Sequence, residues 1–505
     1  MSESPLRIAI CGGGIGGLIA ALTLSRYPDL QVDVYESAAE HGEVGAGIGI
    51  WPRPWAVIEQ LGIDKELLTK TTVNAQRGSH ADRPILYRKA DQPQGYSFYR
   101  LPSQGTLITL HRVDFQQVLL NAFPKSYKLH LKKRLHSYFT HSSASTSALS
   151  PIRLEFADGS HAVCDVLIGA DGLDSNVRKT MLQERDRASF DAADSSSASA
   201  FHSGPPPRGS RPVWTGGVMY RSMVSAASLR NATAGAHRAL KTFVQYVGKG
   251  AYVLAYPVTK GHDELINFVA YSVQYEMEGT YRSGPSVGQA SREELERMFQ
   301  GWEGEVGQLC QCLPSKVNKW AIQTVEPLYT FVHGRVALVG DAAHAMTPHQ
   351  GSGAGQAIED AYLLCTLIGH VASSSSHHHA SSSTRSPPRS DCSSSSSNIH
   401  QRLVEALSVY DRVRRPKAQM VAEKSRQNGM WFTLRETDGR ELNLGRKSSK
   451  SPVVNGAASG GDEAQILADV MERACRGWEW AWRTEEENVG KDVRLALDML
   501  ERRPH

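Results

Sequence analysis

The sequence predicts an α/β protein in which a Rossmann-like nucleotide-binding domain is interleaved with a β-sheet domain and followed by a C-terminal helical segment. A glycine-rich junction between a strand and a helix stands near the N-terminus. Residues 213–331 are rich in β-branched and aromatic residues, and helical patterns dominate from residue 399 onward. The 505 residues are enough for two or three domains.

The first element is an apolar strand at 6–11, and a helix is expected from about Gly14. Between them stands the pattern Gly12-x-Gly14-x-x-Gly17. Glycines at these positions permit a tight turn, close approach of the backbone to a pyrophosphate and close packing of the helix on the strand. The helix N-terminus adds free N–H groups for phosphates.

A second strand, 31–35, ends at Glu36, where an acid can accept hydrogen bonds from ribose hydroxyls. The alternative is a glycine-rich surface turn with an incidental glutamate. Strand, helix, strand and acid in this order favour an ADP-binding site. Whether the ADP belongs to FAD or to NAD(P) stays open at this point.

Two further strands end in a glycine and an aspartate. The strand at 163–168 leads to Asp171 and Gly172, and the strand "RVALV" leads to Gly340 and Asp341. The aspartate in such a position can reach a sugar or ribityl hydroxyl while the glycine lets a ligand approach.

The stretch after Asp341 raises two other interpretations. Asp341, His344 and His349 fall within nine residues, but their spacing matches no standard metal-ligand set. A hydrolase would need a GxSxG turn between a strand and a helix, and "GSG" at 351–353 lacks that context. Neither a metal site nor a hydrolase is therefore expected.

Taken together, the three motifs resemble those of the flavin-dependent aromatic hydroxylases. These are the single-component (group A) FAD monooxygenases typified by p-hydroxybenzoate hydroxylase and salicylate hydroxylase, in a fungal-like version. The resemblance covers residues 5–185 and 210–430. It implies a glutathione-reductase-type FAD-binding domain.

The domain organisation expected from this resemblance has five parts. Serine-rich stretches such as 141–150 and 447–462 are expected to be disordered, since they hold too few apolar residues to offset the entropy of ordering. The predicted parts are the FAD-binding domain, 1–185 and 331–372; the β-rich substrate domain, 186–330, with a disordered insertion at 191–211; a low-complexity linker, 373–398; and the helical region, 399–505.

The resemblance also implies a set of FAD contacts. Trp51-Pro52-Arg53 departs from the Pro-Asn form that is commoner in the mobile-flavin region of the family. The implied contacts are Gly12, Gly14, Gly17 and Glu36 at the ADP end; Arg112; Asp171 and Gly172, linked also to NAD(P)H use; Gly340 and Asp341 at the ribityl chain; and Pro348, Gly351 and Gly353 beneath the isoalloxazine ring.

The chemistry that the resemblance implies belongs to the cofactor. NAD(P)H, bound only transiently, reduces FAD. O2 then adds at flavin C4a, and the hydroperoxide delivers oxygen to an electron-rich ring. One dinucleotide fingerprint suffices for such an enzyme, and the sequence shows only one.

Three residues are candidates for contact with the substrate or for proton transfer. Arg221 resembles an arginine that faces the substrate in fungal relatives, and a guanidinium can pair with a carboxylate or phenolate. Tyr256 lies in another expected strand of the β-rich portion, "GAYVLAYPV", and His349 stands beside Pro348 in the flavin loop. The competing interpretation makes Arg221 a surface residue and Tyr256 a core aromatic residue.

The expected reaction is hydroxylation of a phenolic or aromatic acid. If the attacked carbon carries a carboxylate, CO2 is expelled, and salicylate to catechol is the specific expectation. The alternatives are an FAD-dependent epoxidase or hydroxylase of a non-aromatic secondary metabolite, and a non-enzymatic FAD-fold chaperone of prenylated proteins. Intact Glu36 and Asp341 argue against the last of these.

The bulk composition limits the partners. The net charge is +4 with mixed charges, so nucleic acid is not expected. Seven cysteines, an odd number, favour free thiols and the reducing cytoplasm. No apolar run suits a signal peptide or a membrane span. The expected ligands are FAD, NAD(P)H, O2 and a small aromatic substrate, bound by a monomer or homodimer.

The tryptophans of "WEWAW" are expected in a helix packed on its own domain, with an interface or a lid as alternatives.

Overall fold

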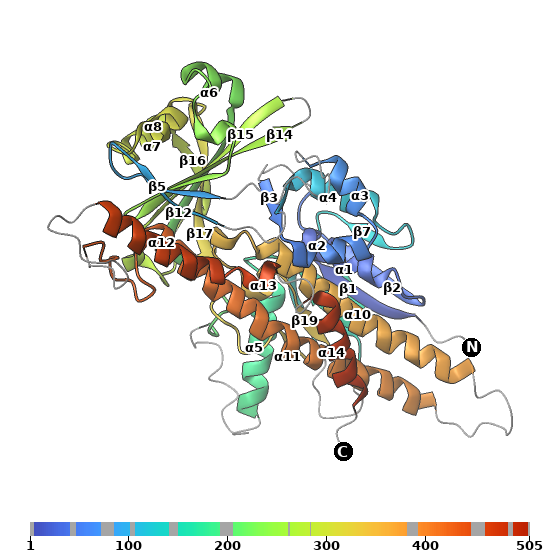
Figure 1. The fold of residues 1–505 in the computed structure, drawn as a ribbon. Coiled ribbons are helices and arrows are strands. Elements are labelled where there is room, and N and C mark those ends of the chain that lie inside the picture. The colour runs from blue at the N-terminus through green and yellow to red at the C-terminus, as the bar shows by residue number, and fades with distance from the viewer. Residues whose placement is uncertain are drawn as a thin grey trace.

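The computed structural model confirms the predicted α/β class (Figure 1). A lobe built on a mostly parallel sheet carries the N-terminal strand, and a second lobe is built on a large, mostly antiparallel sheet. The structure describes residues 5–40, 47–71, 85–101, 107–140, 150–191, 206–260, 263–282, 284–380, 392–445, 460–482 and 488–502.

The first lobe is organised around a six-stranded sheet. The strand β1 lies between β2 and β11 and runs parallel to both, and Cys11 pairs with Tyr35 on one side and with Gly169 on the other. The carboxyl ends of these strands therefore meet at one edge, where ligands bind in open α/β sheets. The order is β18 (Val332–His333), β19 (Val336–Leu338), β11 (Val166–Gly169), β1 (Leu6–Cys11), β2 (Leu30–Tyr35) and β7 (Lys128–His130).

Helices and two small sheets complete this lobe. The helix α1 packs against α10, which begins at the same edge of the sheet. The helices are α1 (Ile15–Leu24), α2 (Pro52–Gln60), α3 (Asp64–Thr69), α4 (Arg112–Asn121), α5 (Asn176–Asp191), α9 (Asp341–His344), the 3-10 turn η4 (Pro348–Gln350) and α10 (Gly353–Ala380). The small sheets pair β3 (Gly47–Ile50) with β6 (Ile108–His111), and join β8 (Leu135–Phe139), β9 (Ile152–Phe156) and β10 (His161–Cys164).

The second lobe contains an eight-stranded sheet with short helices on its outer side (Figure 1). Its strands, in spatial order, are β16 (Val287–Ser291), β17 (Lys316–Thr324), β12 (Val213–Ser225), β15 (Asp263–Val273), β14 (Ala251–Lys260), β13 (Val244–Gly248), β4 (Leu86–Lys89) and β5 (Tyr96–Arg100). The helices are α6 (Ala226–Ala232), α7 (Arg292–Met298) and α8 (Gly304–Gln311), and the 3-10 turns are η2 (Arg238–Leu240) and η3 (Tyr275–Met277).

The sheet pairing differs from the expected division of the chain at 185 and 186. The strands β4 and β5 come from the first 185 residues, yet β4 pairs in parallel with β13 and extends the sheet of the second lobe. The chain thus leaves the nucleotide-binding lobe after α3, adds two edge strands to the other sheet, and returns at β6. Strand pairing is a non-local choice, so the local pattern of 86–100 could not reveal it.

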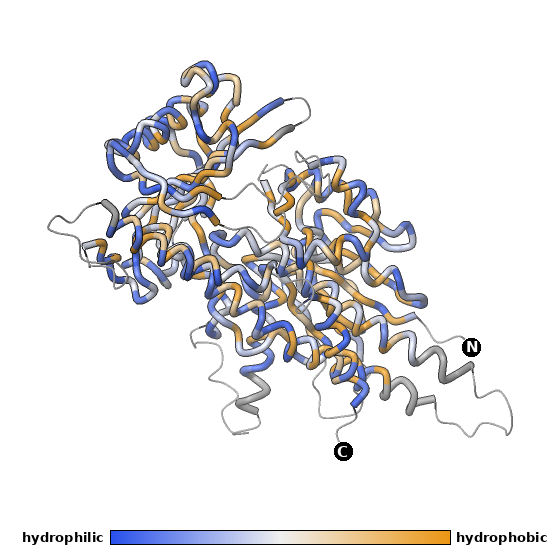
Figure 2. The backbone as a smooth tube through the Cα atoms, in the orientation of Figure 1, coloured by the Kyte–Doolittle hydropathy of each residue, from blue (hydrophilic) through white to orange (hydrophobic). Residues whose placement is uncertain are grey.

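The helical C-terminal region spans both lobes. In Figure 1, α12 lies along the large sheet while α14 lies with α10 and α11 beneath the other lobe. Figure 2 shows hydrophobic residues concentrated along the strands inside the two large sheets. The C-terminal helices are α11 (Cys392–Phe432), α12 (Gly460–Arg476), α13 (Glu479–Trp482) and α14 (Val489–Glu501).

The segments expected to be disordered fall mostly outside the described residues. These are the stretches 141–150, 191–211 and 447–462. The predicted linker at 373–398 is partly described, and there α10 continues to Ala380 and α11 begins at Cys392. The helical elements therefore extend into both ends of that segment.

Candidate functional site

A cavity of about 690 Å³ runs from the carboxyl edge of the six-stranded sheet to the inner face of the eight-stranded sheet. It brings together all the residues that the sequence predicted for the cofactor except Gly17, and it also includes Arg221, Tyr256 and His349.

The glycine-rich turn forms one end of the cavity. Gly12 has φ of 112°, and a Cβ there would lie 2.1 Å from the carbonyl oxygen of Ala170. A Cβ on Gly17 would lie 1.9 Å from the carbonyl oxygen of Gly12, so Gly17 allows the helix to pack on the turn without reaching the cavity. Gly14 is the N-cap of α1 and has open space in front of it. The helix N-terminus is therefore open to an anionic ligand.

Glu36 lies at the rim of this end. Its two carboxylate oxygens accept hydrogen bonds from the backbone N–H of Gly13 and from that of Ala38, each at 2.7 Å. These bonds fix the carboxylate between the glycine turn and the end of β2. It lines the cavity there, as the predicted ribose contact requires.

Asp171 has a structural role that the motif did not reveal. One carboxylate oxygen accepts hydrogen bonds from the backbone N–H of Asn176 at 2.8 Å and of Val177 at 3.1 Å, and the other accepts from the Ser175 hydroxyl. Burial raises the pKa of Asp171, although these hydrogen bonds act in the opposite direction. Asp171 thus caps α5 and holds Gly172, with φ of 76°, at the cavity wall.

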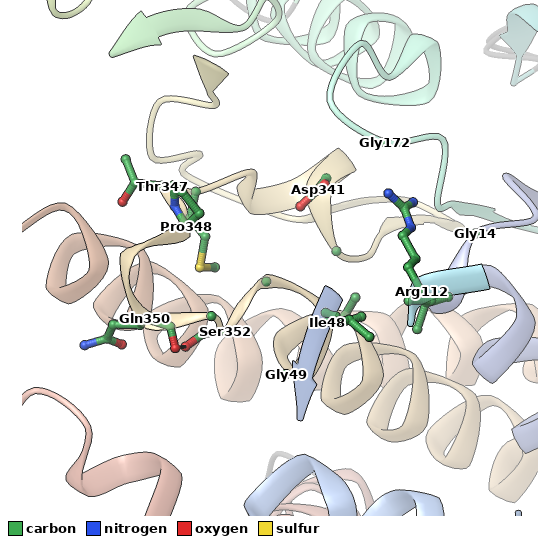
Figure 3. Close-up of a pocket in the computed structure, with 18 of the residues that line it drawn as sticks. Gly14, Ile48, Gly49, Arg112, Gly172, Asp341, Thr347, Pro348, Gln350 and Ser352 are labelled. Carbon is green, nitrogen blue, oxygen red and sulfur yellow. Dashed lines mark hydrogen bonds between the residues drawn. The ribbon is translucent and has the colours of Figure 1, made fainter. Parts of the chain in front are cut away.

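Asp341 and Arg112 face the same space in the middle of the cavity (Figure 3). Gly340 has φ of 60° and turns the chain so that Asp341 begins α9. The described residues provide no hydrogen-bond partner for the Asp341 carboxylate, and its side chain is exposed to the cavity. Both residues are therefore available to a bound ligand.

The loop that leads into α10 forms the wall next to Asp341. Pro348 begins a 3-10 turn, Gly351 takes the left-handed conformation with φ of 61°, and α10 begins at Gly353. All three residues line the cavity, and Figure 3 labels Pro348 together with Gln350 and Ser352, the neighbours of Gly351. The predicted helix start is thus present at the cavity wall.

Tryptophans from distant segments hold this loop, and the sequence did not predict them. The indole N–H groups of Trp51 and Trp478 both donate to the carbonyl oxygen of Gln350, at 2.9 and 3.3 Å. The indole N–H of Trp480 donates to the side-chain oxygen of Gln350 at 3.3 Å. The "WEWAW" segment packs on its own chain, and Trp478 also lines the cavity.

Arg53, which departs from the family pattern, points away from the cavity. Its guanidinium pairs with Glu359 at 3.1 Å and with Asp492 of α14 at 2.5 Å. Arg414 pairs with the same Glu359 at 2.8 Å. Arg53 is 3% exposed and joins α2 to α10, α11 and α14 as part of a buried ionic network.

The inner face of the eight-stranded sheet closes the far side of the cavity. Successive residues of a strand point to opposite faces, so Arg221 on β12 and Tyr256 on β14 point to the same side. One Arg221 Nη donates to the carbonyl oxygen of Gly47 at 3.1 Å. Burial lowers the pKa of Arg221, yet a guanidinium stays charged at any working pH. Burial raises the pKa of Tyr256, and the nearby charge of Arg221 lowers it in part.

His349 lies at the junction of the loop and the sheet. Its Nδ1 is 2.9 Å from the Tyr252 hydroxyl oxygen, and its ring packs edge-on against Tyr271. Burial lowers the pKa of His349 to about 3, so the imidazole is neutral at pH 7. Nδ1 therefore accepts a hydrogen bond from the Tyr252 hydroxyl when the ring proton is on Nε2.

The residues present fit an FAD molecule. Side chains at Gly12 and Gly17 would clash with the backbone, and the glycine turn leaves the N-terminus of α1 open to phosphates. Glu36 lines the cavity where its carboxylate could accept hydrogen bonds from a ribose. Asp341, further along the cavity, has a carboxylate without a partner among the described residues. A second helix N-terminus, that of α10, faces the cavity where an electron-rich ring system would benefit from it.

The same stretch offers no metal centre within the part of the chain that the structure describes. His344 is buried and lies 2.5 Å from Asp360, which also accepts from the Gly340 N–H. Asp360 thus connects α10 to Gly340 and His344 at the start of the loop.

Among the described helices, none combines the length and apolarity that a bilayer crossing requires.

Comparisons with known proteins agree with this geometry. The family model described as "FAD binding domain" matches residues 6–204 and 288–390. The chain is 30% identical to FAD-dependent monooxygenase str9 of Strobilurus tenacellus, over 99% of each chain. It is 32% identical to a salicylate hydroxylase of Pseudomonas putida, over 85% of this chain and 87% of that one. A solved salicylate hydroxylase substrate complex superposes with a TM-score of 0.70 at 28% identity, covering 98% of both chains.

Proposed function

The chain belongs to the family of single-component FAD-dependent hydroxylases, and we propose from this premise that it hydroxylates a phenolic acid. The chain is an FAD-dependent monooxygenase related to salicylate hydroxylase. The proposal adds a substrate class, with NAD(P)H as the transient reductant and O2 as the oxidant.

The observation that carries the proposal is the buried guanidinium of Arg221 facing the cavity. It makes one hydrogen bond, to Gly47, and no ion pair with a carboxylate among the described residues. A buried charge without a counter-ion is costly, and a substrate carboxylate or phenolate would supply the missing partner. A carboxylate could pair with the guanidinium through two hydrogen bonds.

Residues of this chain divide the remaining tasks. Glu36, Arg112 and Asp341, with the turns at Gly12–Gly17 and Pro348–Gly353, would hold FAD. When bound, FAD supplies the redox chemistry with NAD(P)H and O2. The buried aromatic and aliphatic residues of the sheet face exclude water from the reacting ring.

Tyr252 and His349 together can orient a substrate hydroxyl. Neutral His349 accepts a hydrogen bond from the Tyr252 hydroxyl, so the lone pairs of the Tyr252 oxygen are free to accept a hydrogen bond from a substrate hydroxyl. Tyr256 lies beside Arg221, and a phenolate held between them gains both a cation and a donor. Favouring the phenolate makes the ring more electron-rich and more readily hydroxylated.

The specific candidate reaction is the conversion of salicylate to catechol. Two curated relatives are named salicylate hydroxylase, and the solved neighbour is a salicylate hydroxylase substrate complex. With the carboxylate at Arg221, hydroxylation at the carbon that carries it releases CO2. We place the enzyme in the reducing cytoplasm, in keeping with the free thiols of Cys11, Cys164, Cys310, Cys312, Cys365 and Cys475.

The test is a screen of phenolic acids with the purified holoenzyme. Salicylate and other hydroxybenzoates should accelerate NADH or NADPH oxidation and give hydroxylated products, with CO2 if the reaction is decarboxylative. If the protein carries FAD but no aromatic acid stimulates NAD(P)H oxidation, the aromatic assignment fails. The alternative, a hydroxylase or epoxidase of a non-aromatic secondary metabolite, then takes its place.

A further inference from the structure

A row of side chains crosses the inner face of the eight-stranded sheet from Arg221 to Gln245. Arg221 pairs with Val269, Val269 with Leu254, and Leu254 with Gln245. All four line the cavity. Three steps between neighbouring strands, at about 4.8 Å each, separate the backbones of Arg221 and Gln245 by about 14 Å.

Gln245 is the polar residue at the far end of this row. It is 4% exposed, and its Nε2 has no hydrogen-bond partner among the described residues. Its neighbours Val244 and Tyr246 point to the opposite face of β13, into the core under α7 and α8. A buried amide with an unmet hydrogen bond is costly, and because Gln245 lines the cavity, a bound ligand can supply the missing partner.

The surroundings of Gln245 differ from those of Arg221. On the next strand Gln245 pairs with Tyr87, and Trp51 and Trp478 line the same cavity. Between the two polar residues the row offers only Val269 and Leu254. The wall is thus cationic at one end, apolar in the middle, and both aromatic and amide-bearing at the other end.

We propose that Gln245 determines specificity for a two-ended substrate, an aromatic acid whose side arm carries a hydroxyl or carbonyl group on the far side from the acid. The acid lies at Arg221, the ring and arm lie over Val269 and Leu254, and the polar group hydrogen-bonds the Gln245 amide. This inference rests on the proposed function and deepens it. A hydroxybenzoate without an arm is too short to contact both ends.

The experiment compares matched ligands on the holoenzyme. Dissociation constants are measured from the change in flavin absorbance for ortho-hydroxybenzoate and for versions with a hydroxypropyl or a butyl arm para or meta to the carboxyl group. The two arms have similar size, and a hydroxyl can both donate and accept, so either orientation of the amide is served. The hydroxypropyl acid should bind about tenfold more tightly than the butyl acid, the effect of one hydrogen bond.

The variant Gln245→Leu should remove this preference and leave the affinity for ortho-hydroxybenzoate unchanged, which also shows that the protein is folded. Gln289→Leu, at an exposed position of β16, should keep the wild-type preference. Equal affinity of the two arms in the wild type, or a preference that survives in Gln245→Leu, overturns the inference.

The failures of the two proposals are distinguishable. If ortho-hydroxybenzoate and its relatives bind and stimulate NAD(P)H oxidation but the arms make no difference, only the role of Gln245 is wrong. If no acid binds or stimulates oxidation, the phenolic-acid function is wrong, and the two-ended substrate is rejected with it.

Discussion

The indole N–H of Trp51 donates a hydrogen bond to the carbonyl oxygen of Gln350 over 2.9 Å. Trp51 immediately precedes α2, and Gln350 ends the 3-10 turn before α10, so the bond joins two cavity walls that are 299 residues apart in the chain. The same carbonyl accepts from Trp478 of the C-terminal region. The loop that would lie beneath the flavin is therefore fixed from two sides.

Trp51→Phe removes one of these hydrogen bonds. We expect the holoenzyme to lose about 1 kcal/mol of unfolding free energy beyond the loss caused by the smaller ring. Trp482→Phe is the matched control, because Trp482 is 6% exposed against 5% for Trp51, and its indole nitrogen has no partner among the described residues. Urea unfolding of the two variants and the wild type measures both losses of unfolding free energy. Equal losses would show that the bond to Gln350 contributes nothing.

Asp341→Ala should weaken FAD retention. The Asp341 carboxylate faces the cavity without a partner in the described chain, and a charge-assisted hydrogen bond to a ligand hydroxyl accounts for a roughly tenfold to hundredfold change in affinity. Gel filtration followed by the flavin-to-protein absorbance ratio measures retention. Asp498→Ala, at an exposed position of α14, is the control. An Asp341→Ala protein that keeps its full FAD complement contradicts the assignment.

Arg221→Met should raise KM for phenolic acids by about a hundredfold, because a buried charged partner is lost. The corresponding amides lack the carboxylate and should show little change. Arg230→Met provides the control, since Arg230 lies on the surface and pairs with Glu264. Unchanged FAD content together with unchanged acid-stimulated NAD(P)H oxidation would exclude Arg221 from substrate binding.

The sequence was sufficient for those parts of the site that are written as local motifs. Gly12 and Asp341 follow closely after β1 and β19, and the turn at Pro348 comes soon after Asp341, so their neighbours in the chain are also their neighbours in space. Gln245, by contrast, becomes a cavity residue only because β13 pairs with β14 and with β4. The composition of residues 213–331 predicts a sheet, but it does not show which face of β13 lines the cavity.

Tertiary packing also explains the roles of Arg53 and Trp478, which the sequence motifs did not reveal. Arg53 departs from the family pattern, and its role depends on Asp492, which lies 439 residues later. Trp478 lines the cavity only because α13 docks against α2. Such contacts arise from tertiary packing, and no spacing within a short window encodes them.

His349 should make the protein sensitive to acid. Its folded pKa is lowered to about 3 by burial, while the unfolded value is about 6.5. Above pH 6.5 the His349 imidazole is mostly neutral in both the folded and the unfolded state. As the pH falls below 6.5, the unfolded state binds a proton that the folded state does not, so stability is lost progressively down to pH 3. Between pH 7 and 5 the wild type should lose about 2 kcal/mol more than His349→Asn. Parallel pH profiles in urea unfolding would exclude this origin.

Gly429→Ala should destabilise the protein and disturb the His349 ring. A Cβ at Gly429, on α11, would lie 2.3 Å from one ring carbon and 2.4 Å from Nε2 of His349. The ring is itself held by Tyr252 and Tyr271, so it cannot withdraw freely. We expect a loss of about 1–3 kcal/mol in unfolding free energy, typical of overpacking. Gly307→Ala, in α8 with open space around it, should instead gain about 0.5–1 kcal/mol from helix propensity. If both substitutions stabilise the protein, the helix and the ring are not in contact.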